Sequence, residues 1–312
     1  MSTEENSLPF YKRFLIYQKE RFPFLAHGLM ISAFTFSAIS YSRICREATG
    51  FIAWLDFLIG IFATVTLFFL VRIFDEFKDQ KEDKEFRSYL PVPRGLVSLK
   101  ELKVVGWTVA IIQVAVIAFL QLEMLFLYAV VLCYLLLMAV EFFVPTWLKA
   151  HHMTYITSHM VIIPLIDIYA SGLDWLLDGS EPHWGLVWFF AVSFMNGLVL
   201  EFGRKIRTPE KEEEGVTSYT SLYGTKGGTV SWIALMFATM LLAMGASYYA
   251  GYGSLSIFVF GGCFLISSLP GWLFLKEPTV KRSKMIEYAS AGWTALMYLS
   301  LGGIPMIKSL LM

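Results

Sequence analysis

The 312-residue chain has only three cysteines, and their spacing gives neither a metal-binding pattern nor a disulfide framework. It has no excess of either charge, because 25 Lys and Arg balance 25 Asp and Glu. No stretch between its apolar runs is long enough to fold alone as a soluble domain. The polar N-terminus and the lack of a small-residue cleavage site after the first apolar run predict that this run is retained and is not a signal peptide.

Apolar residues are abundant instead. They make up 56% of the chain, and the mean hydropathy of +0.60 is too high for an ordinary soluble domain. The runs are long enough, or nearly so, to cross a hydrocarbon core of about 30 Å as helices. The sequence therefore predicts an all-α polytopic membrane protein. Its nine expected spans lie near 23–41, 51–71, 104–120, 124–144, 154–171, 185–203, 229–250, 253–274 and 288–307.

The basic residues lie mostly on one side of these spans. If the N-terminus is cytoplasmic and the spans alternate, 22 of the 25 Lys and Arg fall on the cytoplasmic side, and Arg43, Arg46 and Lys308 fall outside. This bias predicts a multi-pass protein with a cytoplasmic N-terminus and an outside C-terminus, in the inner membrane if the source is bacterial. Because the basic residues follow membrane topology, nothing indicates nucleic-acid binding.

The order of loops predicts a single membrane domain, 1–312, with two similar parts of about 1–150 and 151–312. In each part, an early span leads into a long charged loop on the cytoplasmic side, 72–103 in the first and 204–228 in the second. Each loop begins as a helical continuation of its span and ends in a stretch with Gly or Pro, which break helices. We expect these two loops to face each other over a central cavity.

The first loop carries three carboxylates at positions i, i+4 and i+8, namely Asp75, Asp79 and Asp83. On a helix this spacing forms one stripe, with neighbouring Cβ atoms about 5–6 Å apart. Magnesium takes oxygen ligands and usually binds one or two carboxylates plus substrate phosphates. The stripe therefore predicts a metal site for a phosphorylated, membrane-dissolved substrate. The alternative is a solvated helix extension in which Lys78, Lys81 and Lys84 neutralise the acids.

Further polar residues have two interpretations each. Arg87 and Arg94 either bind phosphate oxygens or anchor the loop among lipid headgroups. Asn196 and the charged residues after it (Glu201, Arg204, Lys205 and Arg207) are candidates for lining the active site. The alternative is that the charged residues pair with each other, as Glu201 and Lys205 can at i,i+4. Ionisable residues within spans are functional candidates by default but can also bond across helices or lie at span ends; these are His27, Glu141, His159 and Asp167.

These motifs resemble those of the UbiA-type intramembrane prenyltransferase superfamily, over essentially the whole chain. Its first signature, N-D-x-x-D-x-x-x-D, corresponds to D-E-x-x-D-x-x-x-D here, with Asp75 in place of Asn, Glu76 in place of Asp, and Asp79 and Asp83 as matches. The R-P-x-x-x-G-like segment that follows corresponds to LPVPRGLVS. Leu90 stands where Arg is common, which leaves Arg87 or Arg94 for that role.

The second signature departs from the family pattern, D-x-x-x-D-x-x-x-D followed by Gly and Thr-Leu. Glu201 is at the first acidic position and Lys205 at the second, while the GVTSYTSLYG segment keeps the family's ending. Two interpretations remain open: a protein cation replaces one metal and holds the phosphate, or the donor or acceptor differs. The downstream acids are shifted along a longer loop; they are Glu210, Glu212, Glu213 and Glu214.

The resemblance implies nine transmembrane helices in two similar four-helix halves around a cavity. It also implies Mg²⁺-dependent transfer of an isoprenyl group from a prenyl diphosphate to an aromatic or quinone-precursor acceptor. The alternatives are a polyprenyl-phosphate or lipid-headgroup transferase of the same fold, or a non-catalytic isoprenoid binder or transporter. The donor length, the acceptor and the oligomeric state stay open. The implied metal ligands are Asp75, Glu76, Asp79 and Asp83. The implied catalytic residues are Asp75, Asp79, Asp83, Glu201 and Lys205, and the implied substrate-binding residues are Arg87, Arg94, Asn196, Arg204, Arg207 and Tyr219.

Overall fold

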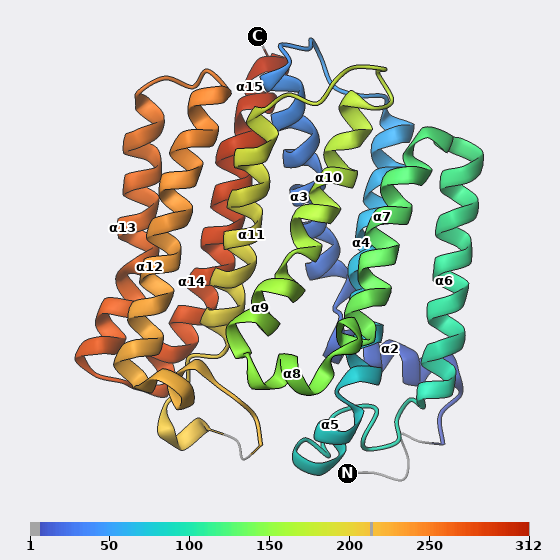
Figure 1. The fold of residues 1–312 in the computed structure, drawn as a ribbon, viewed down its shortest axis with the longest axis vertical. Coiled ribbons are helices and arrows are strands. Elements are labelled where there is room, and N and C mark those ends of the chain that lie inside the picture. The colour runs from blue at the N-terminus through green and yellow to red at the C-terminus, as the bar shows by residue number, and fades with distance from the viewer. Residues whose placement is uncertain (1–6, 213–214, 312) are drawn as a thin grey trace. The chain divides into compact units, whose positions relative to one another are not determined.

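The computed structural model describes residues 7–212 and 215–311, and the regular structure in this part of the chain is all helical (Figure 1). Its α-helices are α2 (Phe10–Arg21), α3 (Phe24–Cys45), α4 (Trp54–Lys78), α5 (Gln80–Phe86), α6 (Leu99–Leu120), α7 (Leu125–Ala139), α8 (Pro145–Ala150), α9 (His152–Met160), α10 (Ile162–Trp175), α11 (Gly185–Arg204), α12 (Tyr219–Tyr249), α13 (Leu255–Lys276), α14 (Val280–Tyr298) and α15 (Ile304–Leu311). Short 3-10 turns are η1 (Leu122–Met124), η2 (Glu141–Phe143) and η3 (Pro209–Lys211), and a π-helical turn is η4 (Leu299–Gly303).

The structure confirms the expected all-α membrane architecture. Within the described residues, nine helical segments are long and apolar enough to cross a membrane, and each overlaps one of the expected runs. They are Phe24–Cys45, Trp54–Lys78, Leu99–Leu120, Leu122–Ala139, His152–Trp175, Gly185–Arg204, Tyr219–Tyr249, Leu255–Lys276 and Val280–Leu311.

Local hydrogen bonding explains why several helices begin, or are interrupted, at positions other than the ends of the apolar runs. The third span begins at Leu99 because Ser98 and Glu101 form a capping box, in which each side chain accepts a hydrogen bond from the other's backbone N–H. The fifth span is divided after Met160, since Pro164 has no N–H to donate to the Met160 carbonyl. The seventh begins early, at Tyr219, because Ser218 caps it.

The contacts divide the chain into two compact units. The first contains Met1–Ser32 and Ala53–Ala150, and the second contains Ala33–Ile52 and His151–Met312. Helix α3 therefore begins in the first unit and ends in the second. The expected arrangement of two similar four-helix halves around a cavity stays a prediction.

In the first unit, the N-terminal helix α2 packs against the end of the second span through an apolar cluster. Tyr17 and Phe22 are buried with Phe69 and Ile73 of α4, and the rings of Phe22 and Phe69 lie 5.4 Å apart. Leu96, from the turn before α6, is buried in the same cluster. Burial of an aromatic side chain contributes about 1.5–3 kcal/mol. This packing fixes α2 beside the acidic end of α4.

In the second unit, α11 lies close to α12 and α14, and a glycine makes the closest approach possible. A Cβ atom on Gly203 would collide with the Ser290 side chain of α14. Trp232 of α12 donates a hydrogen bond from its indole N–H to the same Ser290 hydroxyl at 2.9 Å. These contacts position the C-terminal turn of α11, which carries the second charged motif.

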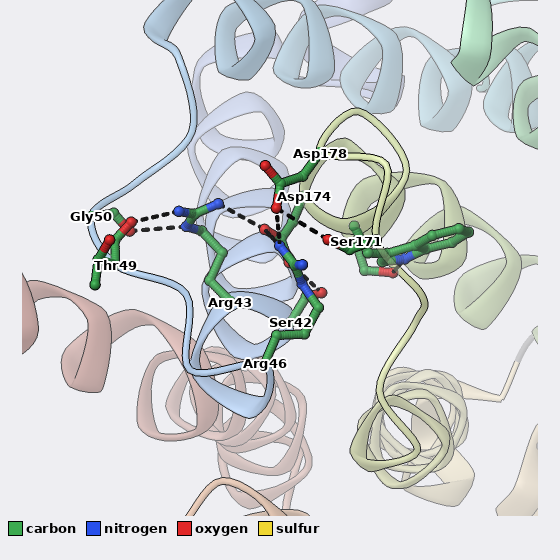
Figure 2. A network of polar contacts seen from close by, with 10 residues as sticks. Ser42, Arg43, Arg46, Thr49, Gly50, Ser171, Asp174 and Asp178 are labelled. Atoms are coloured by element: carbon green, nitrogen blue, oxygen red, sulfur yellow. Dashed lines mark hydrogen bonds and ion pairs between the residues drawn. The ribbon is translucent and has the colours of Figure 1, made fainter.

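The opposite end of the second unit is held by a polar network around Asp174, at the end of α10 (Figure 2). Its carboxylate, 0% exposed, accepts from Arg43 at 2.8 Å, from Arg46 at 2.8 and 3.0 Å, and from Ser42 at 2.7 Å. Arg43 also donates to two carbonyl oxygens of the turn after α3, and Arg46 pairs with the exposed Asp178 at 3.0 Å.

Candidate active site

The first motif lies where α4 gives way to α5. Asp75 and Glu76 are on the last turn of α4, Asp79 is the residue between the helices, and Asp83 is on α5. The backbone N–H of Asp79 donates to the Asp75 carbonyl at 2.9 Å, and that of Asp83 donates to the Asp79 carbonyl at 2.8 Å. These bonds keep the three aspartates on successive turns, as their spacing predicts, although the helix is interrupted at Asp79.

Two of the four carboxylates are buried in ion pairs. Glu76, 1% exposed, is bound by Arg21 at 2.6 Å and by Arg72 at 3.1 Å. Asp83, 2% exposed, is bound by Arg87 at 2.6 Å, with Arg21 at 3.9 Å. Burial raises the pKa of Asp83 above its usual range, while Arg87 and Arg21 oppose that shift. A buried charge needs such partners because an unpaired one is costly.

The other two carboxylates are more accessible. Asp75 is 33% exposed, with Lys78 at 3.3 Å and Arg72 at 3.7 Å. Asp79 is partly exposed and has no ion-pair partner in the described part of the chain. Burial raises the pKa of Asp79, Lys78 opposes the shift, and the neighbouring Asp75 and Asp83 add to it. Asp75 and Asp79 are therefore the carboxylates best placed to receive a ligand.

An open cavity of about 210 Å³ lies beside the paired carboxylates. This volume is below the roughly 300–1,000 Å³ typical of drug-sized ligand sites, so it suits a polar head group and not a whole isoprenoid. Its lining residues are Glu76, Gln80, Asp83, Lys84, Val92 and Pro93.

The two arginines expected to hold phosphate differ in their partners. Arg87 contacts the first motif through its ion pair with Asp83. Arg94 instead holds Glu20 of α2 with two hydrogen bonds of 2.8 Å and donates to the Tyr89 carbonyl at 2.9 Å. The hydrogen bond from Arg94 lowers the pKa of Glu20. Arg94 thus fixes the loop onto α2, and its role toward phosphate stays a prediction.

Sequence reasoning missed the contribution of α2 to this group. Arg21 contacts both Glu76 and Asp83, and the Tyr17 hydroxyl lies 3.5 Å from Glu76. Burial, with the charge of Glu76 as a lesser cause, raises the pKa of Tyr17. The available signal was the basic character of the N-terminus, but the positive-inside rule accounts for Arg21 equally well.

The second motif is a compact group at the end of α11. Glu201, 12% exposed, pairs with Arg204 at 2.6 Å and with Lys205 at 2.7 Å. The structure therefore confirms the i,i+4 pairing that the sequence gave as one interpretation. Tyr219 is joined to the group because its backbone N–H donates to the Lys205 carbonyl at 3.1 Å, and its ring stacks on Phe202.

The remaining residues of the second constellation lie around this group or away from it. The Arg207 backbone N–H donates to Thr220 Oγ1 at 3.0 Å, close to the start of α12. Glu212 accepts from Ser218 at 2.6 Å and from Thr220 at 2.7 Å, so it supports the turn before α12. Asn196 lies further inside the span, near Tyr298. Glu213 and Glu214 lie outside the described residues.

The two motifs belong to different units, with Asp75–Asp83 in the first and Glu201–Lys205 in the second. Their expected arrangement across a common cavity stays a prediction. Among the described residues, no three His, Cys, Asp or Glu side chains are placed to hold one ion. The donor set fits magnesium in its usual form, with one or two carboxylates completed by substrate oxygens and water. Asp75 and Asp79 are the two accessible carboxylates.

Comparison with known proteins places the chain in a family. Residues 32–299 match the model of the UbiA prenyltransferase family. No curated protein matches the sequence. A solved structure of a UbiA homolog from Aeropyrum pernix K1 is 17% identical, with a TM-score of 0.65, covering 89% of this chain and 98% of that one. A structure from work on digeranylgeranylglyceryl phosphate synthase in membranes is 16% identical, with a TM-score of 0.60, covering 92% of this chain and 99% of that one. Because the family model spans most of the sequence and the fold agrees, the chain belongs to the UbiA prenyltransferase family.

Proposed function

We propose that this integral membrane protein transfers an isoprenyl group from a prenyl diphosphate to an aromatic or quinone-precursor acceptor, with magnesium. The observation that carries the proposal is the placement of Asp75, Asp79 and Asp83 on successive turns, beside Arg21 and Arg87. This placement supports binding of a metal-complexed diphosphate in a family whose members are prenyltransferases. The distribution of basic residues supports a cytoplasmic location for this end of the molecule.

Asp75 and Asp79 would hold the magnesium, which when bound would neutralise part of the diphosphate charge. Glu76 and Asp83 have a different role in this proposal. Their ion pairs hold Arg21, Arg72 and Arg87 beside two of the carboxylates that line the cavity. These carboxylates therefore position the cations that face the substrate.

The basic residues would assist departure of the leaving group. When the C1–O bond of the prenyl diphosphate breaks, its electron pair goes to the diphosphate, and negative charge grows there. Cations at that place stabilise the transition state more than the ground state. Arg87 would act from the first motif, and Arg204 and Lys205 from the second. The acceptor then forms a bond to the allylic carbon and releases a proton.

The decisive experiment measures diphosphate release by the purified protein from geranyl, farnesyl and geranylgeranyl diphosphates. The reactions contain magnesium or EDTA and a pooled set of aromatic acceptors. We expect magnesium-dependent release together with a prenylated product, and the preferred donor reports the chain length. No release from any of the three donors by folded protein would reject the proposal in this form.

A second candidate is transfer to a lipid headgroup, such as the hydroxyl of a glycerol phosphate. The observation that favours it is Lys205 at the second acidic position of the motif, where it pairs with Glu201. The similarity of fold to a structure from work on digeranylgeranylglyceryl phosphate synthase is consistent with such an acceptor. Product formation that requires a glycerol-phosphate acceptor and not an aromatic one would favour this candidate.

Prenyl diphosphate binding without diphosphate release would instead indicate a non-catalytic isoprenoid binder or a transporter.

Lys205 tests the role of the second motif. Replacing Lys205 with Met keeps an extended side chain but removes the cation, so we expect weaker binding of the diphosphate. The KM for the prenyl diphosphate should rise by roughly tenfold, which corresponds to loss of one charge-assisted hydrogen bond. Steady-state kinetics measures this change. Lys211→Met on the same loop is the matched control, because Lys211 is exposed, and an equal effect of both variants would contradict a specific role for Lys205.

A further inference from the structure

Two buried polar side chains inside the second unit have no hydrogen-bond partner among the residues that the structure describes. Asp167 of α10 is 0% exposed and Asn196 of α11 is 1% exposed. Neither carboxyl oxygen of Asp167 and neither amide atom of Asn196 has a hydrogen-bond partner within the described residues. Buried polar atoms are nearly always satisfied, so each exception calls for a reason. Ionisable groups within membrane spans are candidates for function.

The two side chains belong to one polar cluster, completed by Ser193 and Tyr298. The Tyr298 hydroxyl donates to Ser193 Oγ at 3.0 Å. Ser193 lies near Asp167, and Tyr298 lies near both Asp167 and Asn196, without the geometry of a regular hydrogen bond to the two unpartnered groups. Ser193 and Asn196 share one face of α11, three residues apart.

Apolar aromatic rings surround Tyr298 of the cluster. The Tyr298 ring packs against Phe34 at 5.1 Å and against Phe189 at 5.9 Å. The π-helical turn Leu299–Gly303 begins directly after Tyr298, and such turns are frequent at functional sites. The polar groups are therefore held in place by packing, and their unpartnered atoms do not arise from exposure to solvent.

A purely structural role does not account for this arrangement. Polar residues that join membrane helices do so by bonding to each other across the interface. Four side-chain atoms of Asp167 and Asn196 instead have no such bond to any described residue. No Lys, Arg or His of the described chain forms an ion pair with Asp167. The cluster offers hydrogen-bond acceptors on Asp167 and both a donor and an acceptor on Asn196. A hydroxyl group complements this set, since it donates one hydrogen bond and accepts others.

The depth of the cluster fits the proposed reaction. Asn196 precedes Glu201 on α11, which places it about 7.5 Å further along the helix axis from the end that carries the charged motif. We propose that Asp167, Ser193, Asn196 and Tyr298 form the site that binds the hydroxyl group of the acceptor. The inference rests on the proposed function. A phenol and a glycerol-based lipid both carry this group, so the hydroxyl is the chemistry that the site recognises.

Binding of matched probes to the purified protein in nanodiscs tests the inference without a prenyl donor. The probes are 4-octylphenol beside its methyl ether, and 1-O-octylglycerol beside its 2,3-di-O-methyl ether; neither ether has a hydroxyl donor. We expect one hydroxyl probe to bind more tightly than its ether, by up to roughly tenfold for one neutral hydrogen bond. Preference for the phenol would identify an aromatic acceptor, and preference for the glycerol a lipid acceptor.

The variants Asp167→Leu and Asn196→Leu should each abolish the preference for the hydroxyl probe. Thr239→Val is the matched control, because Thr239 is equally buried in the same unit and its hydroxyl donates within its own helix, to the Leu235 carbonyl. If Asp167→Leu does not fold, Asn196→Leu decides. Equal binding of hydroxyl and ether probes to the wild type, as expected if ordered water alone fills the site, would overturn the inference. A preference that survives in the folded variants would also overturn it.

Failure of this inference can be distinguished from failure of the proposed function. Loss of the hydroxyl preference with intact diphosphate release would remove only the acceptor site. The protein could instead prefer the hydroxyl probe, lose that preference in the Leu variants, and release no diphosphate. That result would support the hydroxyl site and reject prenyl transfer.

Discussion

Replacing Asp79 with alanine is expected to lower diphosphate release by at least about 100-fold, the scale for loss of one preorganised stabilising group. Asp79 is the carboxylate of the first motif that no described cation pairs with, and it lies between Asp75 and Asp83 on successive turns. In the proposed function, its loss removes a ligand for the metal–diphosphate complex. The measurement is single-turnover diphosphate release with saturating magnesium.

The fold should survive this substitution. The Asp79 side chain makes no capping hydrogen bond to α5, so its removal leaves no buried partner unpaired. Glu82→Ala is the matched control, because Glu82 is an exposed carboxylate of the same short helix and pairs with Lys149 at 2.7 Å. Exposed pairs of this kind contribute about 0–1 kcal/mol. Turnover retained by Asp79→Ala, or lost equally in Glu82→Ala, would contradict the assignment of Asp79 to the metal.

The features that the sequence predicted well are those with short-range patterns. Each span is a continuous apolar run, so its existence follows from composition alone, as the nine candidate spans confirm. The placement of Asp75, Asp79 and Asp83 on successive turns follows from their four-residue spacing. It survives the helix interruption because the i→i−4 backbone bonds continue through it.

The features that the sequence did not predict depend on contacts between distant residues. Glu76 finds Arg21 of α2, 55 positions away, and no local pattern indicates that pair. By the positive-inside rule, Arg43 and Arg46 are exceptions, because the predicted topology places them on the outer side of the membrane. In the structure, both form ion pairs with the buried carboxylate of Asp174. Asp167 was a candidate because it is an ionisable residue in a span, but only the fold brings it near Ser193 and Tyr298.

The paired carboxylates also change the interpretation of the first motif. A helix with several acids and several lysines could be a solvated extension, with the lysines neutralising the acids. Lys78 does pair with Asp75, but the two buried acids, Glu76 and Asp83, are neutralised by arginines of α2, α4 and the segment after α5. Arginine holds two oxygens at once and binds phosphate in the same way. The motif therefore combines accessible carboxylates with arginines already held by ion pairs, and the proposed function uses both.

The second large effect is expected at Asp174, where the change affects stability and not turnover. Asp174→Asn keeps the side-chain volume but removes the charge that neutralises Arg43 and Arg46 (Figure 2). Breaking a buried ion pair from one side typically costs about 3–5 kcal/mol, because the other charge stays buried without compensation. We expect a loss at the lower end of this range, since Arg43 keeps its two carbonyl partners and Arg46 keeps Asp178. Denaturant unfolding in mild detergent measures the change.

Asp178→Asn is the matched control, because Asp178 is 58% exposed and contacts the same Arg46; it should have little effect. Helices α10 and α11 are joined by one loop, so Asp174 at the end of α10 and Glu201 near the end of α11 lie at opposite ends of the second unit (Figure 1). The folded fraction of Asp174→Asn should therefore release diphosphate at the wild-type rate. A stability equal to that of Asp178→Asn would show that the network contributes little. Wild-type stability with reduced turnover would instead place Asp174 in the functional machinery, which its full burial between two arginines argues against.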